Sequence, residues 1–383
     1  MRIAVDAMGG DHAPEAPVRA VVKAALAARE AAAPSEGGRG DRPGLSLILV
    51  GPPARLEPLL GREGERAVAE GLIELFPAAE VITPDEPPVA ALRKKKDSTI
   101  VVGLRLVREK KADALVSAGS TGALMAGAFR EFGRIRGVPR PALATPFPSL
   151  APGGREVLFL DLGANSDARP EHLRAHAVMG SVYAREVMGR ANPRVGLLSN
   201  GTEAGKGSET VKAAHRLLAE TPGLDFAGNI EGRDIFSGAV DVVVTDGFTG
   251  NVVTKVVEGL VEGLFSVMKQ EFLRSLRGRL GAALLVPAFR SIKRRLDYTE
   301  YGGAPFLGLA GACIKCHGSS NAAAIANGIE VARRYVNGRV IETISERLSA
   351  FAVSSDGEGW PDRDEAPDRD EPPDRDEPDR DGP

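Results

Sequence analysis

The feature that most constrains the fold is a series of short aliphatic segments, each followed by a turn and then by an amphipathic stretch. Nearly continuous aliphatic strands that alternate with helices are typical of a parallel sheet covered by helices on both faces. The sequence therefore predicts an α/β fold with three layers, α/β/α, and a mostly parallel sheet. The expected strands are Arg2–Asp6, Leu45–Val50, Ile73–Phe76, Ala114–Ser117, Val157–Leu162, Val195–Ser199, Asp225–Ile230 and Val240–Thr245.

Five of these strands lead into turns that are rich in glycine and polar residues. The carboxyl ends of parallel strands share one edge of the sheet, which is where ligands bind in such folds. Glycine lets the backbone approach a ligand closely, and the helix that follows offers free amides and positive potential. Five such turns on one edge predict an anion-binding site. The turns are Met8–Pro14, Gly119–Gly122, Gly163–Asp167, Asn200–Gly207 and Asp246–Asn251.

Several familiar motifs are incomplete. The first turn lacks the Gly-x-Gly-x-x-Gly fingerprint of dinucleotide sites. The turn containing Lys206 has three residues between its glycines, where a P-loop has four, and Gly207 stands where a P-loop has Ser or Thr. Ser120 directly follows a glycine, so the nucleophile elbow Gly-x-Ser-x-Gly is absent. These departures argue against a dinucleotide-binding, nucleotide-hydrolysing or serine-hydrolase function.

Cys313-Ile-Lys-Cys-His317 matches the attachment pattern of c-type haem. Covalent haem attachment requires export, and the charged start Met1–Asp11 leads us to expect no secretory signal there. A structural zinc site would need a second ligand pair. We therefore interpret the cysteines as two buried thiols. His317 remains open to two readings, as a site residue or as a histidine of the core.

The net charge of −3 is the sum of an acidic C-terminal segment and a basic remainder. Residues 355–383 contain 13 acidic residues and four arginines in a Pro-Asp-Arg-Asp-Glu repeat, whereas the remaining body is basic. The proline period and the charge predict a disordered tail after a single domain at residues 1–350. Because no apolar run is long enough to span a membrane, we expect a cytoplasmic protein. We expect no nucleic-acid partner.

Residues 252–298 are expected to protrude as a helical segment. Apolar residues recur at helical spacing from Val253 to Met268, which dimer packing explains best. Residues 272–296 then hold seven basic and no acidic residues around the apolar stretch Leu280–Phe289. An anionic membrane surface explains this basic apolar tip best, and the core of a dimer is the alternative. The expected membrane contacts are Leu280, Leu284, Leu285 and Phe289.

Four consecutive cations, Arg93–Lys96, precede the helix expected at Thr99–Lys110. A solvated basic loop is one explanation. The other is a docking patch for an acidic protein or a phosphorylated carrier.

Several blocks closely resemble the acyl-carrier-protein:phosphate acyltransferases of bacterial phospholipid synthesis, the PlsX family. They follow the family's order from Met1 to about Ser349. Ser120 stands where the family usually has Asn, and Cys316 where it usually has Ala. The matching blocks are Asp6–Pro14, Arg93–Ser98, Ser117–Ala126, Asp161–Asp167, Val195–Gly207, Asp241–Asn251, Tyr301–Gly303 and His317–Ser320.

The resemblance implies a fold like that of phosphate acetyltransferases and of isocitrate and isopropylmalate dehydrogenases, assembled as a homodimer. It implies transfer of a long-chain fatty acyl group from acyl-carrier protein to inorganic phosphate. The acyl phosphate product would feed a membrane acyltransferase, a further expected partner, that loads glycerol 3-phosphate. Neither a metal nor a cofactor is expected. The rival hypotheses are an acyl-CoA-dependent phosphate transferase, a non-catalytic membrane scaffold and, more distantly, a dehydrogenase.

The resemblance also assigns site residues by position in these blocks. Lys206 is expected to bind phosphate and stabilise the oxyanion, and Asn251 to donate to the oxyanion. Because phosphate is itself the nucleophile, no serine or cysteine nucleophile is needed. The expected substrate- and phosphate-binding residues are Gly119, Ser120, Thr121, Gly122, Asn200, Asp246 and His317.

Overall fold

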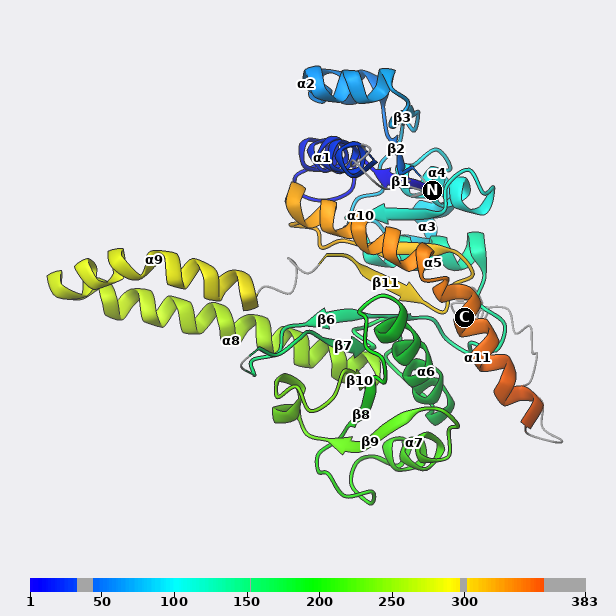
Figure 1. Ribbon diagram of the computed structural model, residues 1–383, viewed down its shortest axis with the longest axis vertical. Coiled ribbons are helices and arrows are strands. Elements are labelled where there is room, and N and C mark those ends of the chain that lie inside the picture. The colour runs from blue at the N-terminus through cyan, green and yellow to red at the C-terminus, as the bar shows by residue number, and fades with distance from the viewer. Residues whose placement is uncertain (33–43, 152, 297–301, 355–383) are drawn as a thin grey trace, which may run out of the picture.

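The computed structural model describes residues 1–32, 44–151, 153–296 and 302–354. The tail that we expect to be disordered, residues 355–383, lies outside the described residues. The described elements form two sheets with helices on both sides and a long helical arm (Figure 1).

The first sheet has seven strands in the order β3-β2-β1-β4-β12-β11-β5. β1, β2, β3, β4 and β12 run parallel, whereas β11 is antiparallel to both of its neighbours. The carboxyl ends of β1, β4 and β12 therefore lie at one edge. The strands are β1 Arg2–Asp6, β2 Ser46–Val50, β3 Ile73–Phe76, β4 Ala114–Ser117, β5 Ala142–Leu143, β11 Ala304–Leu307 and β12 Ala312–Lys315.

The second sheet has five strands in the order β6-β7-β10-β8-β9. Only the edge strand β6 is antiparallel to its neighbour. The chain crosses from the first sheet to the second at Ala144, between β5 and β6. The predicted α/β class with mostly parallel strands is confirmed, but the strands are divided between two sheets. The strands are β6 Thr145–Phe147, β7 Val157–Leu160, β8 Arg194–Leu198, β9 Asp225–Ile230 and β10 Val242–Val244.

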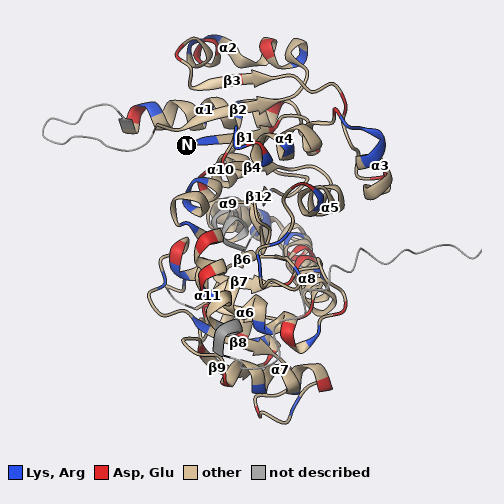
Figure 2. Ribbon diagram, turned by 90° about the vertical axis from the view of Figure 1, so that its right-hand side faces the viewer, with Lys and Arg blue, Asp and Glu red and all other residues tan. Residues whose placement is uncertain are grey.

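Helices cover both faces of the first sheet, which Figure 2 shows edge-on. One face is covered by α1 Glu15–Ala32, α2 Pro53–Ala69 and α10 Ala322–Asn337. The other is covered by α3 Pro88–Lys94, α4 Thr99–Arg108 and α5 Thr121–Phe132. The helix α2 is interrupted at Gly61, because this glycine has a φ of 61°.

The second sheet packs against α6 Pro170–Glu186, α7 Glu209–Ala219 and, through α6, α11 Val340–Ser354. A short 3-10 helix, η1 Gly232–Phe236, follows β9. One continuous apolar cluster joins the two sheets, since it contains Ile3 and Ile314 from the first and Leu158 and Val242 from the second. Burial of this cluster holds the two sheets together, because apolar burial is the dominant favourable term in folding.

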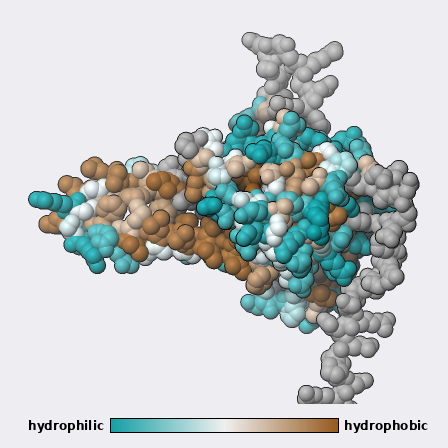
Figure 3. All heavy atoms as spheres, turned by 90° about the horizontal axis from the view of Figure 1, so that it is seen from below, coloured by the Kyte–Doolittle hydropathy of each residue, from teal (hydrophilic) through white to brown (hydrophobic). Residues whose placement is uncertain are grey.

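The arm consists of α8 Gly247–Leu273 and α9 Leu276–Leu296, which fold back on each other and project from the body (Figures 1 and 3). Apolar side chains along it are exposed, including Leu260 on α8 and Leu284 on α9 at 68% and 78%. None of the helices in the described part of the chain is long and apolar enough to cross a membrane.

Candidate active site

Three loops meet at the carboxyl edge of the first sheet. The Ser117 hydroxyl, at the end of β4, donates to Asp6 Oδ2 at the end of β1 over 2.6 Å, and the Gly119 amide donates to Ser117 Oγ over 3.0 Å. The Asp11 amide donates to the carbonyl of Gly318, in the loop after β12, over 2.8 Å. These bonds fix the three turns relative to one another. We call this group of loops the first rim.

Asp6 is the buried anchor of the first rim. Burial raises the pKa of its carboxyl, and hydrogen bonds from Ser117, Thr99 and backbone amides oppose that shift. Its neighbour Gly9 must be a glycine, because a Cβ there would lie 2.6 Å from the Gly119 nitrogen. Asp6 therefore holds the backbone of the turns that follow β1 and β4. The exposed groups of these two turns can then contact a ligand.

The second rim is formed at the carboxyl edge of the second sheet. Because β10 lies between β7 and β8, the turn after β10 is flanked by the turns after β7 and β8. Asp161, just after β7, is buried, and its carboxylate accepts from the amides of Ala164 at 3.1 Å and Asn165 at 2.7 Å. It also accepts from the Leu143 amide of β5 at 3.1 Å, so it connects the second rim to the first sheet.

The first turn of α8 brings two predicted residues to the second rim. Asp246 caps this helix, and its two carboxylate oxygens accept from the Thr249 amide at 2.7 Å and the Thr249 hydroxyl at 2.8 Å. The structure thus gives Asp246 a helix-capping role. Asn251 is exposed and lies beside the turn at Gly163, where a Cβ would come within 3.6 Å of the Asn251 Cβ. Its amide is available as a donor at the helix N-terminus.

Lys206 lies in the turn after β8. Its amide donates to the Glu203 carbonyl over 3.0 Å, and its aliphatic stem lies over Gly201. The ammonium group is exposed and has no hydrogen bond or ion pair within the described part of the chain. The Asn229 side chain supports this turn by donating to the Glu203 carbonyl over 2.9 Å. A free cation on a supported glycine-rich turn is suited to bind an anion.

The predicted site residues divide between the two rims. Gly119, Ser120, Thr121, Gly122 and His317 lie on the first, and Asn200, Lys206, Asp246 and Asn251 on the second. Ser120 caps α5, because its hydroxyl oxygen accepts from the Ala123 amide at 3.4 Å. Thr121 and Gly122 are exposed in the first turn of α5, and Asn200 is exposed at the end of β8.

His317 lies on the first rim, in the loop after β12. It is exposed, and its Nδ1 lies 2.8 Å from the Ser319 hydroxyl, so it is not a histidine of the core. Partial burial and the charge of Lys315 lower its pKa, while Glu258 on α8 raises it and Lys255 on α8 lowers it. Lys255 and Glu258 of α8 therefore act electrostatically on His317 at the first rim.

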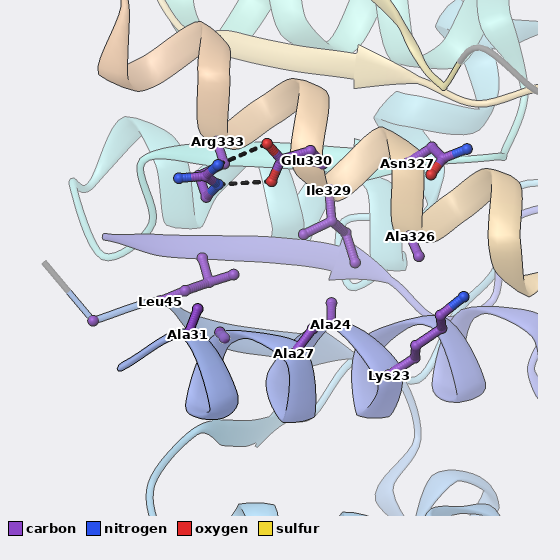
Figure 4. Close-up of a pocket in the computed structure, with 12 residues that line it drawn as sticks. Lys23, Ala24, Ala27, Ala31, Leu45, Ala326, Asn327, Ile329, Glu330 and Arg333 are labelled. Atoms are coloured by element: carbon purple, nitrogen blue, oxygen red, sulfur yellow. Dashed lines mark hydrogen bonds and ion pairs between the residues drawn. The ribbon is translucent and has the colours of Figure 1, made fainter. Parts of the chain in front are cut away.

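A pocket of about 290 Å³ lies away from both rims, between α1 and α10. Figure 4 shows Ala24, Ala27 and Ala31 of α1 facing α10, on which Arg333 forms a bidentate ion pair with Glu330 over 2.7 Å. Leu45, which precedes β2, places this pocket toward the amino ends of the strands. It is therefore separate from the candidate site.

Comparison with known proteins agrees with this geometry. The model of a family described as "Fatty acid synthesis protein" matches residues 1–343. A phosphate acyltransferase of Heliobacterium modesticaldum is 51% identical over 348 residues, which cover 91% of this chain and 98% of the relative. A phosphate acyltransferase of Brevibacillus brevis is 48% identical over 348 residues, covering 91% and 97%. The chain belongs to this family. It is an acyltransferase.

Solved structures with the same fold are also acyl-group transferases. A branched-chain phosphotransacylase of Enterococcus faecalis superposes with a TM-score of 0.52 at 14% identity, covering 88% of this chain and 99% of that one. A phosphotransacetylase of Streptococcus pyogenes superposes with a TM-score of 0.50 at 17% identity, covering 91% and 94%. At this identity the likeness establishes the shared fold.

The two cysteines of the acyltransferase lie in or beside β12, away from solvent. Both are buried, and burial raises each thiol pKa to about 12. Since the thiolate is the reactive form, neither is a nucleophile at neutral pH. The interpretation of Cys313 and Cys316 as two buried thiols is confirmed.

Sequence reasoning missed two hydroxyls, one beside each rim. The Oγ atoms of Ser199, after β8, and Ser320, before α10, are buried and have no hydrogen-bond partner among the described residues. A buried donor without a partner is costly. Both serines lie where a strand gives way to a glycine-rich turn or to a helix start, and both fall inside the matching blocks Val195–Gly207 and His317–Ser320.

Proposed function

We propose that the enzyme transfers a long-chain fatty acyl group from the thioester of acyl-carrier protein to inorganic phosphate. The product is an acyl phosphate, which serves the acylation of glycerol 3-phosphate in phospholipid synthesis. The observation that carries this proposal is the pairing of an exposed cation, Lys206, with an exposed amide, Asn251, on turns of adjacent strands. The relatives from Heliobacterium modesticaldum and Brevibacillus brevis are phosphate acyltransferases, which supports the choice of phosphate as acceptor.

The reaction needs positioning and charge stabilisation. A phosphate oxygen attacks the thioester carbonyl carbon and forms a C–O bond, and the carbonyl oxygen becomes an oxyanion. When the intermediate collapses, the C–S bond breaks and the carrier thiolate leaves, later taking a proton from solvent. Holding phosphate beside the carbonyl removes much of the entropic barrier, and fixed donors stabilise the oxyanion.

Each residue has a role within this scheme. Lys206 binds phosphate and offsets the charge of the oxyanion, and Asn251 donates its amide to the oxyanion. Asp246 and Ser120 hold the N-termini of α8 and α5 in place through their caps. The remaining phosphate and substrate contacts are Gly119, Thr121, Gly122, Asn200 and His317, which lie on the two rims.

We further propose that the enzyme is a cytoplasmic homodimer that binds an anionic membrane surface reversibly. The exposed apolar residues along α8, including Val256, Leu260 and Leu264, support dimer packing of the arm. Leu280, Leu284 and Leu285 are exposed on α9 and support the membrane contact. Figure 3 shows apolar surface along the projecting arm. Phe289 contributes less, because its ring packs against Phe272 of α8 with centroids 5.6 Å apart. In this arrangement residues 1–350 form the catalytic unit, and the membrane acyltransferase that uses the product is a neighbouring partner.

The test is to incubate purified enzyme with palmitoyl-carrier protein, with and without inorganic phosphate, and to trap acyl phosphate as the hydroxamate. Phosphate-dependent hydroxamate is the expected result. If product formed only from acyl-CoA, acyl-CoA would be the acyl donor in place of the carrier protein. Absence of product from either donor, with a folded enzyme, would favour the membrane scaffold.

A further inference from the structure

Three exposed cations at the end of α3 form a surface that the catalytic scheme does not use. We call Arg93, Lys94 and Lys96 the α3 basic cluster, which is visible as a blue segment in Figure 2. None of the three makes a hydrogen bond or an ion pair with any residue that the structure describes. The cation between them differs: Lys95 is half-buried and donates to the Val81 carbonyl over 2.7 Å and to Glu86 over 2.6 Å.

Three of the four acidic groups in residues 80–97 are held by local contacts, and the fourth, Asp85, is exposed. The bond from Lys95 and those from Thr83 lower the pKa of Glu86 to about 2. Asp97 accepts from the Ala79 amide at 2.9 Å, and Glu80 accepts from the Asp97 amide at 3.1 Å. These carboxylates shape the loop on either side of α3, while the α3 basic cluster is directed to solvent.

The α3 basic cluster is attached to the first rim. Pro88, at the start of α3, packs against the first turn of α5, since a Cβ on Gly122 would lie 2.8 Å from the Pro88 Cγ. Arg130 of α5 donates to the Leu92 carbonyl over 3.3 Å, which fixes the other end of α3. A protein that docks on α3 therefore lies beside the turn Gly119–Gly122.

We infer that the α3 basic cluster is the docking surface for the acidic protein that delivers the acyl thioester, an inference that rests on the proposed function. Val89, four residues before Arg93 and thus on the same side of the helix, is 56% exposed and adds an apolar contact within the charged surface. Charge complementarity around a small apolar contact guides encounter and orients a partner. A membrane fits less well, because insertion needs a broad apolar face, which lies on the arm.

The test is the charge-reversal variant Arg93→Glu, Lys94→Glu, Lys96→Glu, assayed with palmitoyl-carrier protein. We expect KM for the carrier to rise by about tenfold or more, with kcat and the KM for phosphate unchanged. Added salt should raise the carrier KM of the wild type and have little effect on that of the variant. The matched control is Arg62→Glu, Arg136→Glu, Arg216→Glu, which makes the same change in net charge at exposed arginines on other elements.

Direct binding of fluorescently labelled carrier protein, followed by anisotropy, separates this inference from the proposed function. Loss of binding in the cluster variant alone supports the docking surface, even if the wild type were to form no acyl phosphate. An unchanged carrier KM and unchanged binding would overturn it, as would an equal effect of the control variant. Loss of flotation with anionic vesicles without a change in carrier KM would assign the α3 basic cluster to the membrane instead.

Discussion

Replacing Gly250 with alanine tests whether the close contact between α8 and β7 positions the candidate site. Gly250 lies in the first turn of α8, one residue before Asn251, and a Cβ there would be 1.9 Å from the Asp161 carbonyl oxygen. Contacts below 3.0 Å are not tolerated by real Cβ atoms, so the start of α8 must shift by more than 1 Å. The clashing atom is backbone, and no side-chain rotation can relieve it.

The magnitude follows from two opposing terms. Overpacking costs about 1–3 kcal/mol, and a clash with backbone belongs at the upper end of that range. Alanine offsets about 1 kcal/mol of this through its higher helix propensity. We expect a net loss of about 2 kcal/mol in the free energy of unfolding. A displacement of about 1 Å at a reacting group costs about a hundredfold in rate, so we expect a comparable fall in kcat.

Thermal unfolding followed by circular dichroism and the hydroxamate assay measure these two effects. Gly259→Ala is the matched control on the same helix, because nothing lies within 4 Å of the position of its Cβ. This control should be as stable as the wild type or more so, through helix propensity alone. If Gly250→Ala had the melting temperature and kcat of the wild type, the contact would have no role in positioning Asn251.

Three further predictions concern charge, membrane binding and pH. Lys206→Ala should lower kcat/KM by about tenfold or more in the hydroxamate assay, because it removes the exposed cation of the second rim. The control Lys212→Ala removes only the ion pair with Glu209 and should leave kcat/KM unchanged. Leu284→Glu with Leu285→Glu should abolish flotation with anionic vesicles, and flotation equal to wild type would refute the membrane contact. Burial lowers the pKa of His176 from 6.5 to about 4. Between pH 6.5 and about pH 4 the unfolded state therefore binds more protons than the native state. Stability should therefore fall as pH drops through that window, by about 3 kcal/mol, and urea titrations should show a shallower fall for His176→Gln.

The parallel strands could be predicted because each is a short aliphatic run beside a helix. The predicted range Arg2–Asp6 coincides with β1, and Ala114–Ser117 coincides with β4. β11 and β12 were not predicted. β12 pairs in parallel with β4, a segment about two hundred residues earlier in the chain, and the Cys-x-x-Cys-His pattern that begins within it suggests a motif rather than a strand.

The glycine-rich turns predict where the candidate site lies, but the contacts that its residues make could not be predicted from the sequence. Asp246 and Ser120 look like polar ligands in sequence, whereas each caps the helix that follows it. The buried role of Asp161 depends on the Leu143 amide, which a separate strand supplies. Such partners are set by tertiary packing, and no local pattern encodes them.

The arm and the candidate site share one helix, and this connects the two proposed activities physically. Asn251 lies in the first turns of α8, and Leu264 on the same helix is exposed along the arm. A helix of 27 residues is about 40 Å long and transmits a tilt at one end to the other. Contacts that the proposed dimer or membrane surface would make with the arm would therefore act on the orientation of Asn251. The Asp246 cap and the packing of Gly250 against Asp161 hold the first turn of α8 in place and oppose such a tilt. The variant Gly250→Ala loosens this first turn, so its effect on kcat should be larger when the arm is bound to vesicles than when the enzyme is free.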